Sequence, residues 1–112
     1  MIVDDHPSFL AVARFLLEAE GFDVVGVASD GESAVRETVR FSPEFVLLDV
    51  TLPDMDGFEV ATRLRAAGVS STIVFTSSRE LTEFGSLVTD SGGSGFVAKA
   101  ELTGDALRAF AA

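Results

Sequence analysis

The stretch Phe45-Val46-Leu47-Leu48-Asp49-Val50 decides the fold, because it is apolar at every position but one. A run this apolar indicates a strand that is buried on both faces, as in parallel sheets that carry helices on either side. Asp49 lies near the carboxyl end of the run, and in open parallel α/β sheets the sites form at that end of the strands. The stretch therefore predicts a fold class and marks the sheet edge where a site is expected.

Three further apolar runs also end at polar side chains. Met1-Ile2-Val3 is followed by Asp4 and Asp5, Ile73-Val74-Phe75 by Thr76, and Phe96-Val97-Ala98 by Lys99. Because parallel strands all end at one edge of a sheet, we expect these side chains to meet Asp49 there. Carboxylates recruit Mg²⁺, which also accepts phosphate oxygens, and a lysine pairs with phosphoryl oxygens as a point charge. The set predicts a Mg²⁺-assisted phosphoryl site, in which an aspartate can act as a covalent nucleophile.

Strand-like and helix-like patterns alternate five times along the chain. The expected strands cover residues 1–3, 24–28, 45–50, 72–76 and 96–98. The expected helices cover residues 7–20, 32–41, 58–67, 80–90 and 103–111. Alternation at this spacing predicts right-handed βαβ units, and hence a parallel α/β sheet with helices on its faces.

Helical spacing also predicts which side chains the first and last helices bury. The first helix is expected to bury Phe9, Val12, Ala13, Leu16 and Leu17, and the last to bury Leu107 and Phe110. The helix at 80–90 is poorly specified, because it contains a glycine and several threonine and serine residues.

Length and composition restrict the class of protein. The 112 residues favour one domain covering 1–112, and a hydrophobic content of 47% excludes a disordered acidic tail. The first strand and the last helix are short, so both ends are expected to be trimmed relative to a complete domain. No run reaches the roughly 18 apolar residues of a membrane span, and we expect no signal peptide and no membrane partner.

Charge and cysteine content exclude further classes. The formal net charge is −10, so the domain is expected to repel the phosphate backbone and not to bind nucleic acid directly. There is no cysteine, which excludes a disulfide framework and a thiolate metal site and fits a cytoplasmic location.

Over essentially its whole length the chain resembles the receiver domain of two-component response regulators. The matching segments are residues 2–7 (IVDDHP), 47–57 (LLDVTLPDMDG), 73–77 (IVFTS) and 95–99 (GFVAK). The resemblance implies a flavodoxin-like (βα)5 three-layer sandwich, with a five-stranded parallel sheet of order 2-1-3-4-5. The segment at 4–7 is also common in receivers attached to helix-turn-helix DNA-binding domains, so an output domain of that kind is one expected partner.

The resemblance also implies a role for each site residue. Asp49 would be the phosphoacceptor. Mg²⁺ would be bound directly by Asp5 and Asp49, through water by Asp4, and by the backbone carbonyl of Thr51. Thr76 and Lys99 would contact the phosphoryl group, and Thr76 and Phe96 would form the switch.

The partners and the activity follow from the same resemblance. A sensor histidine kinase or a phosphotransfer protein would donate the phosphoryl group. The face formed by the segments at 80–90, 96–98 and 103–111 would then act on an output domain or partner protein, or form a homodimer. The domain would be a signalling module and not an ordinary enzyme, although it would phosphorylate itself from small phosphodonors with Mg²⁺ and dephosphorylate itself.

The chain departs from the family pattern at three positions. Phe96 has no hydroxyl, so a switch there has to work by packing. Ser77 stands where alanine or glycine is usual and would add a hydroxyl near the phosphoryl oxygens. Ala100 follows Lys99 where many members have a proline after a cis bond, and we expect a trans bond because a non-proline cis bond costs about 2.5–4 kcal/mol. His6 is expected to be exposed beside the site.

Other classes fit the residues less well. A flavin electron carrier would need a hydroxyl- and glycine-rich phosphate loop where the acidic segment 4–7 stands. Residues 54–57 (DMDG) match a short nucleophile motif of haloacid-dehalogenase-type phosphatases, but they follow Pro53 in a loop and do not end a strand. An EF-hand would need glutamate in place of Arg63. The alternative left open is a receiver-like interaction module that is not phosphorylated.

Overall fold

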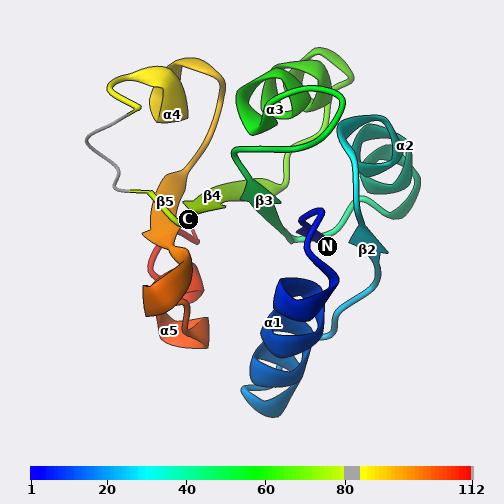
Figure 1. Ribbon diagram of the computed structural model, residues 1–112. Coiled ribbons are helices and arrows are strands. Elements are labelled where there is room, and N and C mark those ends of the chain that lie inside the picture. Colours follow the sequence, from blue (N-terminus) through cyan, green and yellow to red (C-terminus); the bar gives the residue numbers. More distant parts are fainter. Residues whose placement is uncertain (80–83, 112) are drawn as a thin grey trace.

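The computed structural model describes residues 1–79 and 84–111, which form one parallel sheet flanked by helices (Figure 1). The strands are β1 (Ile2–Val3), β2 (Val27–Ala28), β3 (Phe45–Asp49), β4 (Thr72–Ser77) and β5 (Gly95–Ala98). The helices are α1 (Pro7–Ala19), α2 (Gly31–Phe41), α3 (Gly57–Ala66), α4 (Leu87–Asp90) and α5 (Gly104–Arg108), with a 3-10 turn, η2 (Lys99–Glu101), after β5. The strand order β2-β1-β3-β4-β5 confirms the predicted fold class and sheet order.

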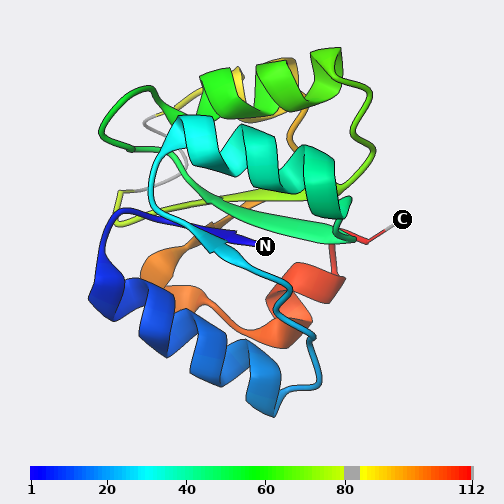
Figure 2. The same cartoon turned by 90° about the vertical axis from the view of Figure 1, so that its right-hand side faces the viewer.

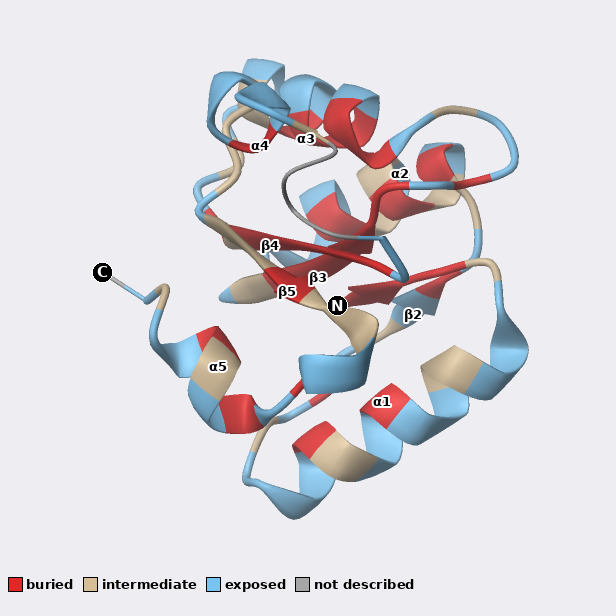
Figure 3. Ribbon diagram, turned by 60° about the vertical axis from the view of Figure 1, so that its left-hand side comes forward, coloured by how far each residue is buried: buried red, intermediate tan, exposed pale blue. Residues whose placement is uncertain are grey.

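The sheet separates two layers of helices (Figure 2). α2, α3 and α4 lie over one face, and α1 and α5 lie over the other. Successive side chains of β3 therefore enter different parts of the core, because side chains alternate along a strand. Leu48 packs in the cluster on the α2 and α3 side, and Leu47 packs in the cluster on the α1 and α5 side. β3 and β4 are buried almost throughout, as Figure 3 shows.

Three aspartates fix the amino-terminal ends of α2 and α3. Asp30 accepts a hydrogen bond of 2.8 Å within the first turn of α2, and Asp54 accepts two, of 2.7 and 3.0 Å, from the first two residues of that helix. Asp56 accepts a bond of 2.8 Å in the first turn of α3. Carboxylates at these positions satisfy free N–H groups and favour the helix dipole. The aspartates of the loop at 54–57 therefore cap helices. This structural role explains why they occur there, in a pattern that matches a phosphatase motif.

Most predicted boundaries agree with the structure within one residue, and those of three elements do not. β2 covers only Val27–Ala28 instead of 24–28, because β1 offers partners to just these two positions. α5 ends at Arg108 instead of at residue 111, and Phe110 is only partly buried while Leu107 is buried as predicted. The predicted helix at 80–90 lies partly outside the described residues. Within the described part the prediction is wrong at 84–86, which form a turn, and α4 covers only the last four positions. No cis peptide bond occurs in the described chain, so the expected trans bond before Ala100 is confirmed.

The prediction that Val12 is buried is wrong. Val12 is 63% exposed, whereas Ala13 and Leu17 are the buried residues of α1. A residue turns by about 100° from the one before it in an α-helix, so Val12 lies to the side of the buried face that Ala13 defines. Phe9 and Leu16, which flank that face, are partly buried.

Within residues 1–79 and 84–111, no helix has both the length and the apolar character that spanning a bilayer requires.

Gly57 is expected to be sensitive to a single added methyl group. It begins α3 and donates a hydrogen bond of 2.7 Å to the carbonyl of Val50, and a Cβ there would overlap the carbonyl oxygen of Asp49. Since backbone atoms cannot move aside cheaply, Gly57→Ala should lower the free energy of unfolding by about 1–3 kcal/mol. Urea unfolding followed by far-UV circular dichroism measures this.

Gly26→Ala is the matched control. Its Cβ would meet only the flexible end of the Met1 side chain, at 3.3 Å, and its backbone does not have a positive φ. We expect little change in stability there. Equal losses in the two variants would mean that the approach of α3 to β3 imposes no special constraint.

Candidate functional site

The polar residues at the strand ends lie on one face of the sheet. Ile2, Leu47, Val74 and Val97 all pack in the cluster on the α1 and α5 side. Two positions further along each chain segment come Asp4, Asp49, Thr76 and Lys99. Because side chains alternate along extended backbone, these four emerge on that same face, at the carboxyl edge of the sheet. Asp49 and Thr76 are direct neighbours in the β3–β4 register.

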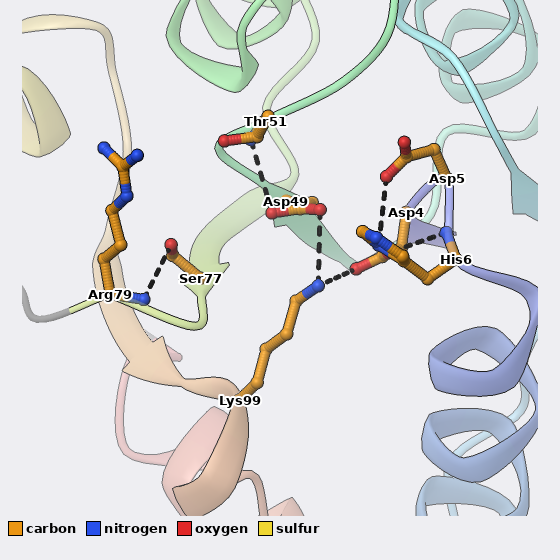
Figure 4. A network of polar contacts seen from close by, with 8 residues as sticks. All are labelled: Asp4, Asp5, His6, Asp49, Thr51, Ser77, Arg79 and Lys99. Atoms are coloured by element: carbon orange, nitrogen blue, oxygen red, sulfur yellow. Dashed lines mark hydrogen bonds and ion pairs between the residues drawn. The ribbon is translucent and has the colours of Figure 1, made fainter.

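Lys99 joins the two buried carboxylates of the site (Figure 4). Its Nζ lies 2.6 Å from Oδ2 of Asp4 and 3.4 Å from Oδ2 of Asp49. The ring of Phe9 on α1 lies under the ammonium at 4.6 Å from its centroid, and the lysine side chain is only 18% exposed. The structure therefore brings together three of the predicted residues at the carboxyl ends of β1, β3 and β5, with one positive charge between two negative ones.

The surroundings shift the pKa values of the two carboxylates in opposite directions. Burial, followed by the negative charge of Asp4, raises the pKa of Asp49 to about 6. Burial alone would raise the pKa of Asp4 as well, but hydrogen bonds from Lys99 and His6 outweigh it and lower that pKa. For Lys99, burial is outweighed by the same contacts and charges, and its pKa is raised. The site thus contains one strong ion pair, Lys99–Asp4, and one carboxylate, Asp49, that lacks a full counter-charge.

The segment after β1 surrounds this pair with further ligands for a cation. The backbone N–H of His6 donates to Oδ1 of Asp4 at 2.8 Å, and Asp5 is one-third exposed beside them. Asp4, Asp5, His6 and Asp49 each offer a ligand atom, and these atoms lie within 4.8 Å of one another. Oδ1 of Asp5 is buried and accepts no hydrogen bond from the described residues, whereas the buried Oδ2 of Asp4 has the Lys99 ammonium beside it. Carboxylate oxygens gathered this closely, one of them buried without a donor, fit a hard divalent cation with oxygen ligands.

Thr51 and Thr76 complete the surroundings of Asp49. The backbone N–H of Thr51 donates to Oδ1 of Asp49 at 3.3 Å, while its carbonyl remains a predicted metal ligand. The hydroxyl of Thr76 is buried and has no hydrogen-bond partner in the described part of the chain. The hydroxyl of Ser77 accepts a bond of 3.0 Å from the backbone N–H of Arg79, within the loop after β4. A buried hydroxyl without a partner is costly, so Thr76 is ready to donate to a group that arrives at the site.

Phe96 lies at the end of a row of aromatic rings that sequence reasoning did not find. Phe75, next to Thr76, packs on Phe58 at 4.8 Å between centroids, and Phe58 packs on Phe84 at 5.7 Å. Phe84 in turn packs on Phe96 at 5.7 Å. The only signal in the sequence is the abundance of phenylalanine, 10 residues in 112. The row connects the buried neighbour of Thr76 with the partly exposed Phe96.

The family of the chain follows from comparison with known proteins. The family model of the response regulator receiver domain matches residues 1–110. The chain therefore belongs to the receiver domains of two-component response regulators, which are signalling modules and not ordinary enzymes. The resemblance found in the sequence is confirmed.

Relatives and solved structures agree with this family. The chain is 34% identical over 101 residues to the virulence factors putative positive transcription regulator BvgA of Bordetella pertussis, covering 90% of this chain and 48% of BvgA. It is 33% identical over 101 residues to the DNA-binding transcriptional activator EvgA of Escherichia coli, covering 90% and 50%. The signal receiver domain of the putative response regulator NarL from Mycobacterium tuberculosis superposes with a TM-score of 0.87 at 28% identity, covering 97% and 92%. The chain spans about half the length of the curated relatives it matches.

The raised pKa of Asp49 predicts that this residue destabilises the metal-free domain. At pH 7.5 Asp49 is ionised in the folded and in the unfolded chain, and folding opposes that charge. Asp49→Asn should therefore raise the free energy of unfolding by about 1–3 kcal/mol in EDTA. As the pH falls through about 6, the folded carboxyl takes up a proton that the unfolded one takes up only near 3.8, so the difference should shrink.

Urea unfolding at pH 7.5 and pH 5, followed by circular dichroism, tests both statements. Asp105→Asn is the control, because the Asp105 side chain is 99% exposed and should give no such stabilisation. A less stable Asp49→Asn variant at pH 7.5 would mean that Lys99 compensates Asp49 fully.

Proposed function

We propose that the domain, residues 1–112, accepts a phosphoryl group on Asp49 from the phosphohistidine of a sensor histidine kinase or a phosphotransfer protein. The observation that supports this best is the site itself. Asp49 is a buried carboxylate without a full counter-charge, and it lies beside a lysine, two further acids and a hydroxyl to which the described residues offer no partner. Ordinary acidic surface residues do not combine these features.

Each residue then has a chemical role. An oxygen of ionised Asp49 attacks the phosphorus while the bond from phosphorus to the donor nitrogen breaks. Lys99, already 3.4 Å from Asp49, shifts its charge toward the equatorial phosphoryl oxygens. Asp5, Asp49 and the Thr51 carbonyl, with Asp4 acting through water, are the residues that would hold Mg²⁺. That ion, when bound, neutralises the negative charge that accumulates during in-line transfer.

The same group changes the output face in this proposal. The Thr76 hydroxyl donates to a phosphoryl oxygen, because it has no other partner among residues 1–79 and 84–111. Its movement changes the packing at Phe75, and the change reaches Phe96 through the row of rings. The face formed by α4, β5 and α5 then favours a different contact. A local charge change is in this way turned into a change of a two-state surface.

The partners and location belong to the same proposal. Several relatives are transcription regulators about twice as long as this chain. We therefore propose an output domain or partner protein, reached through the α4–β5–α5 face, which is also a surface for homodimerisation. The domain acts in the cytoplasm and, with a net charge of −10, does not bind nucleic acid itself. Self-phosphorylation from small phosphodonors and self-dephosphorylation are part of the proposed activity.

Intact-protein mass spectrometry after incubation with acetyl phosphate and Mg²⁺ tests the chemistry. We expect one added phosphoryl group in the wild-type chain, none in Asp49→Asn, and none with EDTA. Asp105→Asn, at an exposed position of α5, should accept the group as the wild type does. Addition to Asp49→Asn at the wild-type rate would disprove the assignment, and addition to neither protein would favour the non-phosphorylated interaction module.

The role of Phe96 is tested by NMR spectroscopy of the α4–β5–α5 face. Amide resonances of ¹⁵N-labelled protein, with and without beryllofluoride and Mg²⁺, should shift both at the site and in α4, β5 and α5. In Phe96→Ala the site resonances should still shift, whereas those of α4 and α5 should respond less, because the last ring of the row is missing. An unchanged response in α4 would mean that the rings do not transmit the switch.

A further inference from the structure

His6 lies closer to the acidic site than its exposure suggests. Its Nδ1 is 3.0 Å from Oδ1 of Asp4 and 3.1 Å from Oδ1 of Asp5, although the imidazole is 64% exposed (Figure 4). Two ligands that are adjacent around an octahedral ion at about 2.1 Å lie about 3.0 Å apart. The imidazole nitrogen therefore lies at the distance from both carboxylates that a shared coordination sphere requires.

The backbone holds His6 in this place. His6 is the N-cap of α1, with extended backbone angles, and Pro7 begins the helix behind it. Its N–H donates to Asp4, and its carbonyl accepts from Leu10 at 3.1 Å. The imidazole makes no cap hydrogen bond, and its Nδ1 is instead hydrogen-bonded to Oδ1 of Asp4. Little rearrangement would be needed to bring Nδ1 onto a cation between the two acids.

A second observation points to a ligand at the same place. Oδ1 of Asp5 is buried and accepts no hydrogen bond from any described residue, despite its short separation from His6 Nδ1. Asp4 is fully buried, and the Lys99 ammonium lies 2.6 Å from its Oδ2. The hydroxyl of Thr76, buried in register beside Asp49 and on the same face, has no partner among the described residues. A buried carboxylate oxygen next to His6 and a buried hydroxyl next to Asp49 thus lack a hydrogen-bond partner in the described part of the site.

We propose that His6 Nδ1 is an additional protein ligand, and that it makes the acidic site prefer an imidazole-binding divalent transition cation to Mg²⁺. Nitrogen of imidazole suits zinc, nickel and similar ions, whereas carboxylates and water suit Mg²⁺. Ligation uses the Nδ1 lone pair, so the bound imidazole carries its proton on Nε2. The inference rests on the proposed function in one respect, namely that the same carboxylates hold the cation.

Isothermal titration of the tag-free protein with Zn²⁺ and with Mg²⁺, for wild type and His6→Gln, tests the preference. Zn²⁺ affinity should fall at least about 10-fold in the variant, the loss typical when a residue that supports a metal is removed. Mg²⁺ affinity should stay unchanged, because glutamine leaves the carboxylates in place. Circular dichroism shows that both proteins are folded, and Asp5→Asn should weaken both ions.

The chain contains a single histidine, which gives a direct second measurement. In protein with ¹⁵N-labelled histidine, Zn²⁺ should shift the Nδ1 resonance strongly, and Mg²⁺ should not. Zn²⁺ binding that leaves this resonance unmoved would overturn the inference, even if the His6→Gln variant bound Zn²⁺ more weakly. His6 would then act on the cation only through hydrogen bonds. Equal Zn²⁺ affinity in the two proteins would overturn it as well.

The two proposals fail in different ways. If Mg²⁺ binds and Asp49 is phosphorylated, but Zn²⁺ is not coordinated by His6, only the inference about His6 is wrong. If neither cation binds the wild-type protein, the acidic site is not a metal site, and the proposed function loses its cation as well.

Discussion

The charge balance around Lys99 is the constraint on which the site depends. The single ammonium of Lys99 lies beside two buried carboxylates, and it is closer to Asp4 than to Asp49. A single positive charge cannot compensate both in a partly dehydrated environment, where uncompensated charge is expensive. The fold therefore leaves Asp49 in a strained electrostatic position, which the hydrophobic core on both sides of the sheet has to offset. A residue kept in that condition is suited to chemistry and poorly suited to stability.

The sheet places these charges with few elements. Asp49 and Thr76 are fixed by the β3–β4 register, and Lys99 is delivered by the end of β5, two strands away from β3. The β3–α3 loop is packed tightly at Gly57, where α3 starts against the backbone of Asp49. Movement at the site is thereby restricted on the β3 side. On the side of α4 and β5, Phe84 and Phe96 make aromatic contacts, which can rearrange without breaking hydrogen bonds.

The sequence predicted the parts of the site that depend on strand ends alone. Asp4, Asp49, Thr76 and Lys99 were identified because each follows an apolar run, and parallel strands end together. Val12 was misplaced because α1 is apolar on several sides, so its spacing does not decide which face is buried. The length of β2 depends on how many partners β1 offers, which is a property of the pair. The row from Phe75 to Phe96, and the nearness of His6 to both acids, arise from distances between elements that no local pattern contains.

The common face of the four site residues has a consequence for how such a chain can change over time. Each lies two positions after a residue of the α1–α5 core, and the side chains alternate with a period of two. Deleting or inserting one residue between core and site in any of these segments would turn the functional group toward the opposite layer of helices. Substituting one of the four residues changes the chemistry at that position and leaves the other three side chains in place. This site can therefore evolve by substitution but not by insertion or deletion in these segments. Loops at the opposite edge of the sheet can change in length without reversing the direction of a site residue.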